Sequence, residues 1–286
     1  MLERASSASR GSSHGQGPGE SLRARRRQRR RRVLVSLCIL LLLLLAGALY
    51  ELNQSVARIS HVQMFGADQS LAELATEAMR GSYLGIVPRD STFFFPATSI
   101  RAALISAYPG IAAISIFRNG LTGLTIKVDN RVAIARWCGL APTDFAAAGS
   151  AHGAEEYCYL FDASGFIFAA AATSTETLNP FSLYAPLTGE TLEPLRATLA
   201  HASELPGAFD FARELATLGS PVTRVVLRGD EVDDYLASGT RVTYVLGNEQ
   251  NAFTALVSAQ GDLNLVDGSL EYVDLRFDRK MYLKKR

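Results

Sequence analysis

The pattern of apolar and polar positions divides the chain at one uninterrupted apolar segment near its N-terminus. Residues 33–50, with the sequence VLVSLCILLLLLLAGALY, contain no charged side chain. A helix of this length spans roughly 27 Å, which is enough to cross the hydrocarbon core of a bilayer. The segment therefore predicts a transmembrane helix. A cleaved signal peptide is the alternative, because Ala46-Gly47-Ala48 is a small-x-small sequence.

After this segment, the pattern changes to the short elements of an α+β fold. The predicted elements are, in chain order, a strand at 59–66, a helix at 70–81, a loop at 83–96, a helix at 99–110 and two strands around Asn119-Gly120. Asn-Gly is a dipeptide that strongly favours a hairpin turn. This βααββ order resembles a POTRA domain, a small module that docks to other polypeptides, and we assign it to residues 58–128.

Residues 129–286 are predicted to form a second, mainly antiparallel β domain with one or two helices. Its predicted elements are strands at 131–139 and 156–171, a helix at 205–219, strands at 222–229 and 233–247, and a short helix at 252–263. Asp162-Ala163-Ser164-Gly165 has the composition of a tight turn within the second of these strands.

The last segment of the chain alternates between apolar and polar positions. One face would carry Val273, Leu275, Phe277, Met281 and Leu283, and the other Tyr272, Asp274, Arg276, Asp278 and Lys280. Such period-two alternation predicts one long final strand. No segment after it remains to pair with its outer side, so we expect an exposed sheet edge.

Charge is distributed unevenly along the chain. Residues 1–32 contain ten Arg and two acidic residues, a balance of +8, whereas the rest has 19 basic and 26 acidic residues, a balance of −7. The Arg residues immediately before the apolar segment are Arg25, Arg26, Arg27, Arg29, Arg30, Arg31 and Arg32. Positive charge beside a first span stays in the cytoplasm. Residues 1–32 are therefore predicted to be a disordered cytoplasmic tail, and this arginine block is explained as a topology signal that contacts anionic lipid rather than as a nucleic-acid site.

Two of the three cysteines, Cys138 and Cys158, lie in the predicted extracytoplasmic part. They could form a disulfide if the compartment is oxidising and if their strands are neighbours. Two buried free thiols are the alternative. Cys38 lies within the apolar segment, where it is expected to be an inert small side chain.

The sequence offers little catalytic chemistry. None of the four His residues has a partner at zinc-ligand spacing, and no nucleophile elbow or dinucleotide loop occurs. The acidic cluster Asp230, Glu231, Asp233 and Asp234 lacks the ligand spacing of a calcium loop and is interpreted as a solvated loop. We therefore expect no cofactor, no metal and no enzymatic activity.

Three stretches, in the same order, resemble the FtsQ/DivIB family of bacterial cell-division proteins. They are DNRVAIARW at residues 129–137, EYCYLFDASGFIF at 156–168 and LEYVDLRFDRKMYL at 270–283. The last is similar to the terminal Tyr-[Val/Ile]-Asp-Leu-Arg-[Tyr/Phe] strand of that family. The join at 129–137 departs from the family pattern, because Asn130 stands where an acid is usual and the proline is absent.

This resemblance implies a non-enzymatic, single-span scaffold of septum assembly in the cell membrane. The POTRA-like domain would take part in recruitment, and the terminal strand would pair with a small single-span partner of the FtsB type, itself in a coiled coil with an FtsL-type protein. The implied partner-binding residues are Tyr272, Asp274, Arg276, Phe277, Asp278, Arg279, Lys280, Met281 and Tyr282.

Other interpretations stay open at this point. The final strand could simply be the last strand of a sheet, although a long edge is also a template for one added strand. The basic residues Lys280, Lys284, Lys285 and Arg286 are of the kind that discourage promiscuous edge pairing. A component of a protein secretion or translocation assembly could also carry a POTRA-like domain. A membrane-anchored hydrolase would need an acid–base pair that the sequence does not reveal.

Overall fold

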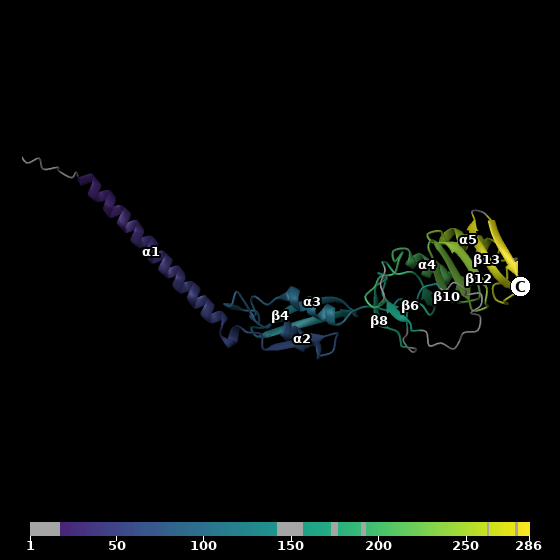
Figure 1. Cartoon of the computed structure of the whole chain (residues 1–286), viewed down its shortest axis with the longest axis horizontal. Helices are drawn as coiled ribbons and strands as arrows, with labels where there is room; N and C mark the ends of the chain where they lie inside the picture. Colours follow the sequence, from purple (N-terminus) through teal and green to yellow (C-terminus); the bar gives the residue numbers. More distant parts are fainter. Residues whose placement is uncertain (1–17, 142–156, 173–176, 190–192, 262, 278–279) are drawn as a thin grey trace, which may run out of the picture. The chain divides into compact units, whose positions relative to one another are not determined.

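The structure is a computed structural model that describes residues 18–141, 157–172, 177–189, 193–261, 263–277 and 280–286. It is a mixed α+β protein with a long apolar N-terminal helix and a large β sheet (Figure 1). The chain divides into two compact units, one of Met1–Val62, Met79–Pro96 and Arg118–Leu124, the other of Gln63–Ala78, Ala97–Phe117 and Thr125–Arg286. The predicted domain boundary after residue 128 stays a prediction.

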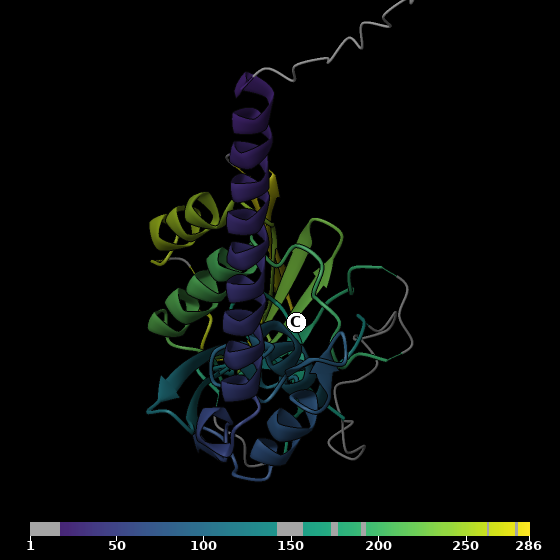
Figure 2. The same cartoon turned by 90° about the vertical axis from the view of Figure 1, so that its left-hand side faces the viewer.

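The first element, α1 (Pro18–Leu52), is one unbroken helix of 35 residues (Figure 2). Within it, Arg26–Leu52 is long and apolar enough to cross a membrane. The prediction of disorder is wrong for residues 18–32, which are helical. Arg, Leu and Gln are good helix formers, and a helix nucleated in the apolar segment extends at little cost per added residue. Residues 1–17 of the predicted tail lie outside the described part.

A three-stranded sheet follows α1, with the order β1-β5-β4. The elements of this region are the 3₁₀ helix η1 (Ser55–Ala57), β1 (His61–Phe65), α2 (Leu71–Ala78), β2 (Ser82–Tyr83), β3 (Val87–Pro88), α3 (Ala97–Ala107), β4 (Ile111–Asn119) and β5 (Gly123–Asn130). The five longer elements after η1 follow the predicted βααββ order. The segment predicted as a loop contains, in addition, the short antiparallel pair β2–β3.

A nine-stranded sheet contains the remaining strands, in the order β14-β13-β12-β11-β10-β9-β6-β7-β8. They are β6 (Ala135–Trp137), β7 (Tyr159–Phe161), β8 (Ile167–Ala170), β9 (Ser182–Tyr184), β10 (Val222–Arg228), β11 (Glu231–Leu236), β12 (Arg241–Val245), β13 (Leu270–Phe277) and β14 (Lys280–Lys285). Most neighbours are antiparallel, as predicted, but β12 and β13, β9 and β10, and β6 and β9 are parallel. The strand expected over 131–139 covers only residues 135–137.

Two helices, α4 (Leu205–Thr217) and α5 (Glu249–Ser258), explain two of the parallel pairs, because each lies between the two strands in the chain. Parallel neighbours need such a crossover. Both helices pack on the sheet and on each other (Figure 1). Phe209, Ala212 and Leu215, spaced three residues apart on α4, are buried, so this side of the helix faces the core. The ring centroids of Phe211 on α4 and Tyr244 on β12 lie 4.4 Å apart, and both residues are buried.

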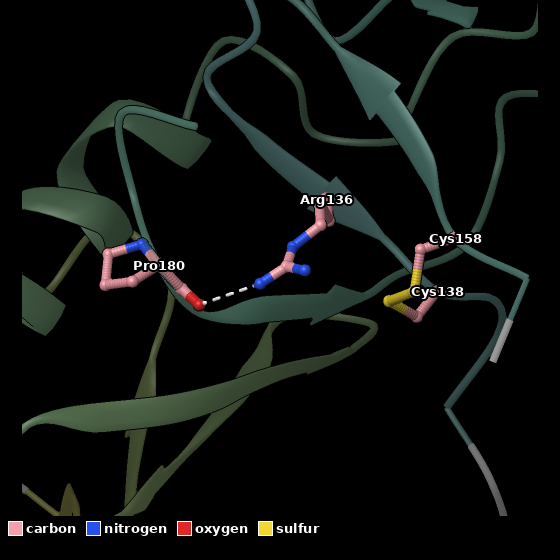
Figure 3. Close-up of a disulfide and its surroundings, with 4 residues drawn as sticks. All are labelled: Arg136, Cys138, Cys158 and Pro180. Atoms are coloured by element: carbon pink, nitrogen blue, oxygen red, sulfur yellow. Dashed lines mark hydrogen bonds between the residues drawn. A yellow bond between two sulfur atoms is a disulfide. The ribbon is translucent and has the colours of Figure 1, made fainter. Parts of the chain in front are cut away.

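A disulfide joins Cys138 to Cys158 (Figure 3). The pairing of β6 with β7 places Trp137 opposite Tyr159, so the two cysteines next to them in the chain come together. Figure 3 also shows the side chain of Arg136 donating to the carbonyl oxygen of Pro180, at 3.4 Å. The structure thereby selects the disulfide over two free thiols for these residues.

The turn between β7 and β8 has the chemistry that its sequence predicts. Asp162 Oδ1 accepts hydrogen bonds from the backbone N–H groups of Ser164 and Phe166, and Gly165 has a φ of +75°. Burial raises the pKa of Asp162, but hydrogen bonds from Ser164 and from Arg131 outweigh it and hold the pKa below its ordinary value. Arg131 also donates to the carbonyl oxygen of Pro109, at 3.1 Å, and stacks on the ring of Phe166.

The acidic cluster at 230–234 is not a solvated loop, because most of it belongs to strand β11. Alternation along this strand turns Asp233 and Asp234 to opposite faces, and both are buried. Asp233 accepts a hydrogen bond from Thr243 and pairs with Arg228. Asp234 instead lies on the face covered by the helices, and neither carboxyl oxygen has a hydrogen-bond partner among the described residues. Burial, and secondarily the charge of Glu249, raise the pKa of Asp234 well above its ordinary value.

We expect Asp234→Asn to stabilise the protein increasingly as the pH rises. The folded state keeps a proton on Asp234 that the unfolded state releases above about pH 4, so wild-type stability falls as the pH rises toward the folded-state pKa. The amide does not titrate, and at neutral pH we expect a gain of about 1–3 kcal/mol. Urea unfolding of the full chain in detergent between pH 5 and pH 8 measures this difference. Asp230→Asn, at an exposed position of the same cluster, is the control; equal pH dependence of both variants would contradict the prediction.

Candidate protein-binding edge

The C-terminal segment is a hairpin and not the single long strand that its alternation predicted. β13 ends at Phe277, and β14 begins at Lys280 and runs antiparallel to it. Asp274 lies opposite Tyr282, and Val273 lies opposite Leu283. The outer side of β13 is therefore paired by the chain itself. The expectation that residues 272–277 expose their backbone to a partner is wrong.

The sequence marks this reversal only weakly, because Asp278 is the single turn-favouring residue in it. The segment Phe277–Met281 contains neither Gly, Pro nor Asn, and its apolar positions keep the phase of a continuous strand. β13 also contains irregularities between Leu270 and Tyr272 and between Asp274 and Phe277. Such bulges shift the phase of side chains along a strand.

The free edge of the large sheet belongs to β14. β14 is the last strand in the sheet order, and no strand among the described residues pairs with its outer side. The opposite end of the sheet differs, because Ile167 of β8 exchanges hydrogen bonds with the backbone of Arg196 and Ala197. The chain itself thus covers the outer side of β8 at Ile167, whereas the outer side of β14 has no strand partner among the described residues.

The hydrogen bonds of β14 indicate which of its backbone groups face outward. The N–H of Arg286 donates to the carbonyl oxygen of Ser269, at 3.0 Å, so the backbone of this residue faces β13. The backbone groups of successive residues in a strand point to alternate sides. The outward-facing backbone groups of β14 are therefore those of Met281, Leu283 and Lys285.

One face of this hairpin continues the hydrophobic core. Val273 and Leu275 of β13 are buried, and Met281 of β14 packs against the same core. Leu283, opposite Val273, is 43% exposed because no further strand covers it. An added strand with apolar side chains at matching positions would bury Leu283 and extend the core.

The other face is held by a charged network around Arg276. The guanidinium of Arg276 donates hydrogen bonds to both carboxyl oxygens of Asp274, at 3.0 and 2.7 Å. It also donates a hydrogen bond to Glu231, at 2.5 Å. The hydrogen bonds from Arg276 hold the pKa of Asp274 below its ordinary value. Because Glu231 belongs to β11, this network ties β13 to a strand two positions away in the sheet.

Further contacts on this face reach β14. The rings of Phe277 and Tyr282 meet edge to face with centroids 5.2 Å apart, and each residue is about half exposed. Lys284 pairs with Glu271, which raises the pKa of the Lys284 ammonium. The guanidinium of Arg286 donates to the carbonyl oxygen of Gly239, at 2.7 Å, and fixes the end of the strand.

The structure separates the predicted partner-binding residues into two groups. Tyr272, Asp274, Arg276 and Phe277 lie on β13, with its two backbone edges paired, whereas Lys280, Met281 and Tyr282 lie on the edge strand. Asp278 and Arg279 lie outside the described residues. Leu283 and Lys285 also belong to the open edge. They are not among the predicted partner-binding residues, because the prediction treated residues 272–283 as one strand.

A pocket of about 160 Å³ lies beside the turn between β7 and β8, lined mostly by apolar side chains that include Phe161, Leu205 and Phe209. Its polar side chains bond to each other or to neighbours, since Arg213 donates to Asn179 and to Asp210. Among the described residues, no group of three or more His, Cys, Asp or Glu side chains could hold a metal ion. The open edge is therefore the stronger candidate site.

Comparisons with known proteins identify no family for this chain. No protein-family profile matches it, and no curated protein sequence matches it. The candidate site thus depends on geometry and on the motifs of the sequence.

Replacing Asp274 by Asn should destabilise the hairpin at neutral pH, because the uncharged amide replaces the carboxylate that accepts hydrogen bonds from Arg276. A hydrogen bond to a charged group contributes roughly 2 kcal/mol. Since the folded-state pKa of Asp274 is lowered, its contribution is present above about pH 4 and is lost as the pH falls through the folded-state pKa. The difference in unfolding free energy between variant and wild type should therefore shrink in acid. Lys284→Gln, which removes an exposed ion pair, should change little.

Proposed function

We propose that this chain is a single-span membrane scaffold of the bacterial cell-division machinery. Its extracytoplasmic part would recruit and align other division proteins without catalysing a reaction. Strand β14 would pair with a strand of a small, FtsB-like single-span partner. The observation that carries the proposal is the outer edge of β14, with which no strand among the described residues pairs.

Edge pairing suits recognition of one partner. Backbone hydrogen bonds along an added strand supply affinity, and alternate side chains supply selection. On the core side the added strand would cover Met281 and Leu283. The edge also carries Lys280, Lys285 and Arg286, which favour a partner segment that contains acidic residues and disfavour self-association.

The N-terminal region supports the membrane part of the proposal. α1 contains a stretch long and apolar enough to span a membrane. The side chains of residues 33–48 are exposed and not packed against the rest of the protein. The arginine block would hold the N-terminus in the cytoplasm. The disulfide between Cys138 and Cys158 fits an oxidising, extracytoplasmic location of the large sheet.

The smaller sheet supports the proposed family in a different way. We infer that residues 58–128 form a POTRA-like docking domain and that residues 129–286 form the β domain. The order β1-α2-α3-β4-β5 and the central position of β5 between β1 and β4 are consistent with this inference. A recruiting partner would bind to these residues, which are distant in the sequence from the edge strand β14.

A proline scan of β14 tests the edge. Met281→Pro and Leu283→Pro each remove an outward-facing N–H, so both should abolish co-purification of the FtsB-like protein with the full chain from detergent-solubilised membranes. Proline is tolerated on an edge strand when its missing N–H faces solvent, so the hairpin should persist. Protease resistance of the region around β13 checks this point.

Matched controls separate the backbone from the side chain. Met281→Val and Leu283→Val keep the N–H and an apolar β-branched side chain, and should retain the partner. If the proline variants stay folded and still retain the partner as well as the valine variants do, β14 is not the binding edge.

Localisation in cells tests the cellular role. A fluorescent protein at the N-terminus should give a mid-cell ring before constriction begins, because a recruiting scaffold precedes septum synthesis. Depletion of the protein should give filaments. A uniform peripheral signal with normal division and a secretion defect would instead identify a component of a translocation assembly.

A further inference from the structure

A small hairpin close to the end of α1 exposes its apolar side chains to an unusual degree. It consists of β2, a turn and β3, and Tyr83, Leu84 and Ile86 are 41%, 97% and 55% exposed. Leu84, at the tip, is almost fully exposed although its side chain is among the most apolar. Apolar side chains that stay in water at this tip do not contribute burial free energy to the folded protein.

The backbone at the tip adds a second cost. Leu84 has a φ of +52° and Gly85 a φ of +74°, and the N–H of Ile86 donates to the carbonyl oxygen of Tyr83. Two central residues with positive φ form the turn that twists in the same sense as a hairpin. Asn, Asp or Gly normally occupies the first of these positions, whereas Leu is disfavoured there. Strained residues often mark functional positions.

The hairpin lies close to the proposed membrane surface. β3 packs against α1, and both belong to the same compact unit. Ile59 donates its N–H to the carbonyl oxygen of Asp90, and Thr92 donates its N–H to the carbonyl oxygen of Ala57. Ala57 follows the last residue of α1 by five positions and ends a 3₁₀ turn, so this attachment lies within about 15 Å of the end of the span.

A second set of exposed apolar side chains lies beside the segment that follows α1. Phe93, Phe94 and Leu121 are each more than half exposed. The hydroxyl of Thr92 donates to the carbonyl oxygen of Leu121, and the N–H of Thr92 donates to Ala57. Thr92 therefore joins the turn that contains Leu121 to the segment that follows α1. The guanidinium of Arg118 lies 5.7 Å from the ring of Phe93, and that of Arg89 lies 5.7 Å from the ring of Tyr83.

We propose that the β2–β3 hairpin inserts its tip into the outer interface of the bilayer and acts as a second membrane anchor beside α1. The interface accepts Leu and Ile among acyl chains, Tyr and Phe at the level of the headgroups, and Arg beside phosphates. The lipid surface is the occupant because the span brings it to this hairpin. Insertion removes the apolar tip from water and explains an exposed Leu in a strained turn.

The consequence is orientational. A span alone lets the extracytoplasmic part pivot about the short connection after Leu52, whereas a second contact fixes one side of the unit to the membrane. This inference rests on the proposed membrane location of α1, and the experiment below tests the two separately.

Environment-sensitive labels on single cysteines test the insertion. Cys38 is the only free cysteine of the described chain and reports on α1. In a Cys38→Ser background, Leu84→Cys places the label at the hairpin tip, and Leu178→Cys, at a residue 69% exposed, is the matched control. The full chain is reconstituted in vesicles of phosphatidylethanolamine and phosphatidylglycerol that contain lipids with a quenching nitroxide near the headgroup or deep in the acyl chain.

We expect the label at position 84 to lose about half of its emission with the shallow nitroxide and to be protected from aqueous iodide. The label at position 178 should show the reverse. Because the vesicles contain no other protein, quenching at position 84 can come only from lipid.

The outcomes distinguish the two claims. If Cys38 is quenched by the deep nitroxide while position 84 behaves like position 178, α1 spans the membrane and the hairpin inference is wrong. If Cys38 is not quenched either, the proposed membrane location fails together with the inference.

Discussion

The pairing of main-chain hydrogen-bonding groups is the constraint on which the large sheet depends. Each strand has donors and acceptors on two sides, and a buried group without a partner is costly. Helix crossovers between β9 and β10 and between β12 and β13 place parallel neighbours inside the sheet. At Ile167 of β8 the segment around Arg196 supplies the missing partners. No strand among the described residues supplies them to the outer side of β14.

The hairpin that carries the proposed binding edge is held firmly. Arg276 ties β13 to β11 through Glu231, and Arg286 fixes the end of β14 to Gly239. Ordering a strand costs conformational entropy, and a strand that is already ordered spares an incoming partner that cost. Confinement of both partners to one membrane would raise their effective concentration further, so moderate affinity at the edge would suffice.

The two neighbouring acids of β11 show how the same residue type acquires opposite roles. Asp233 faces the polar side and is stabilised by Arg228 and Thr243, whereas Asp234 faces α4 and α5 without a hydrogen bond among the described residues. Only the direction of the strand's pleat separates them. Burial raises the pKa of Asp234 well above its ordinary value, and neither of its carboxyl oxygens has a hydrogen-bond partner among the described residues.

The sequence alone determined the elements that depend on local periodicity. The apolar helix, the helix over 205–219, the hairpin at Asn119-Gly120 and the turn at Asp162 all follow from spacing and turn chemistry over a few residues. The sequence left open whether Cys138 and Cys158 pair, and the pairing of β6 with β7 decided it. The tertiary structure decided what alternation cannot express: where the terminal segment reverses, which strand ends the sheet, and which face of β11 meets the helices. Strand pairing joins residues that are distant in the chain, and a period of two reports only that successive side chains point to opposite sides.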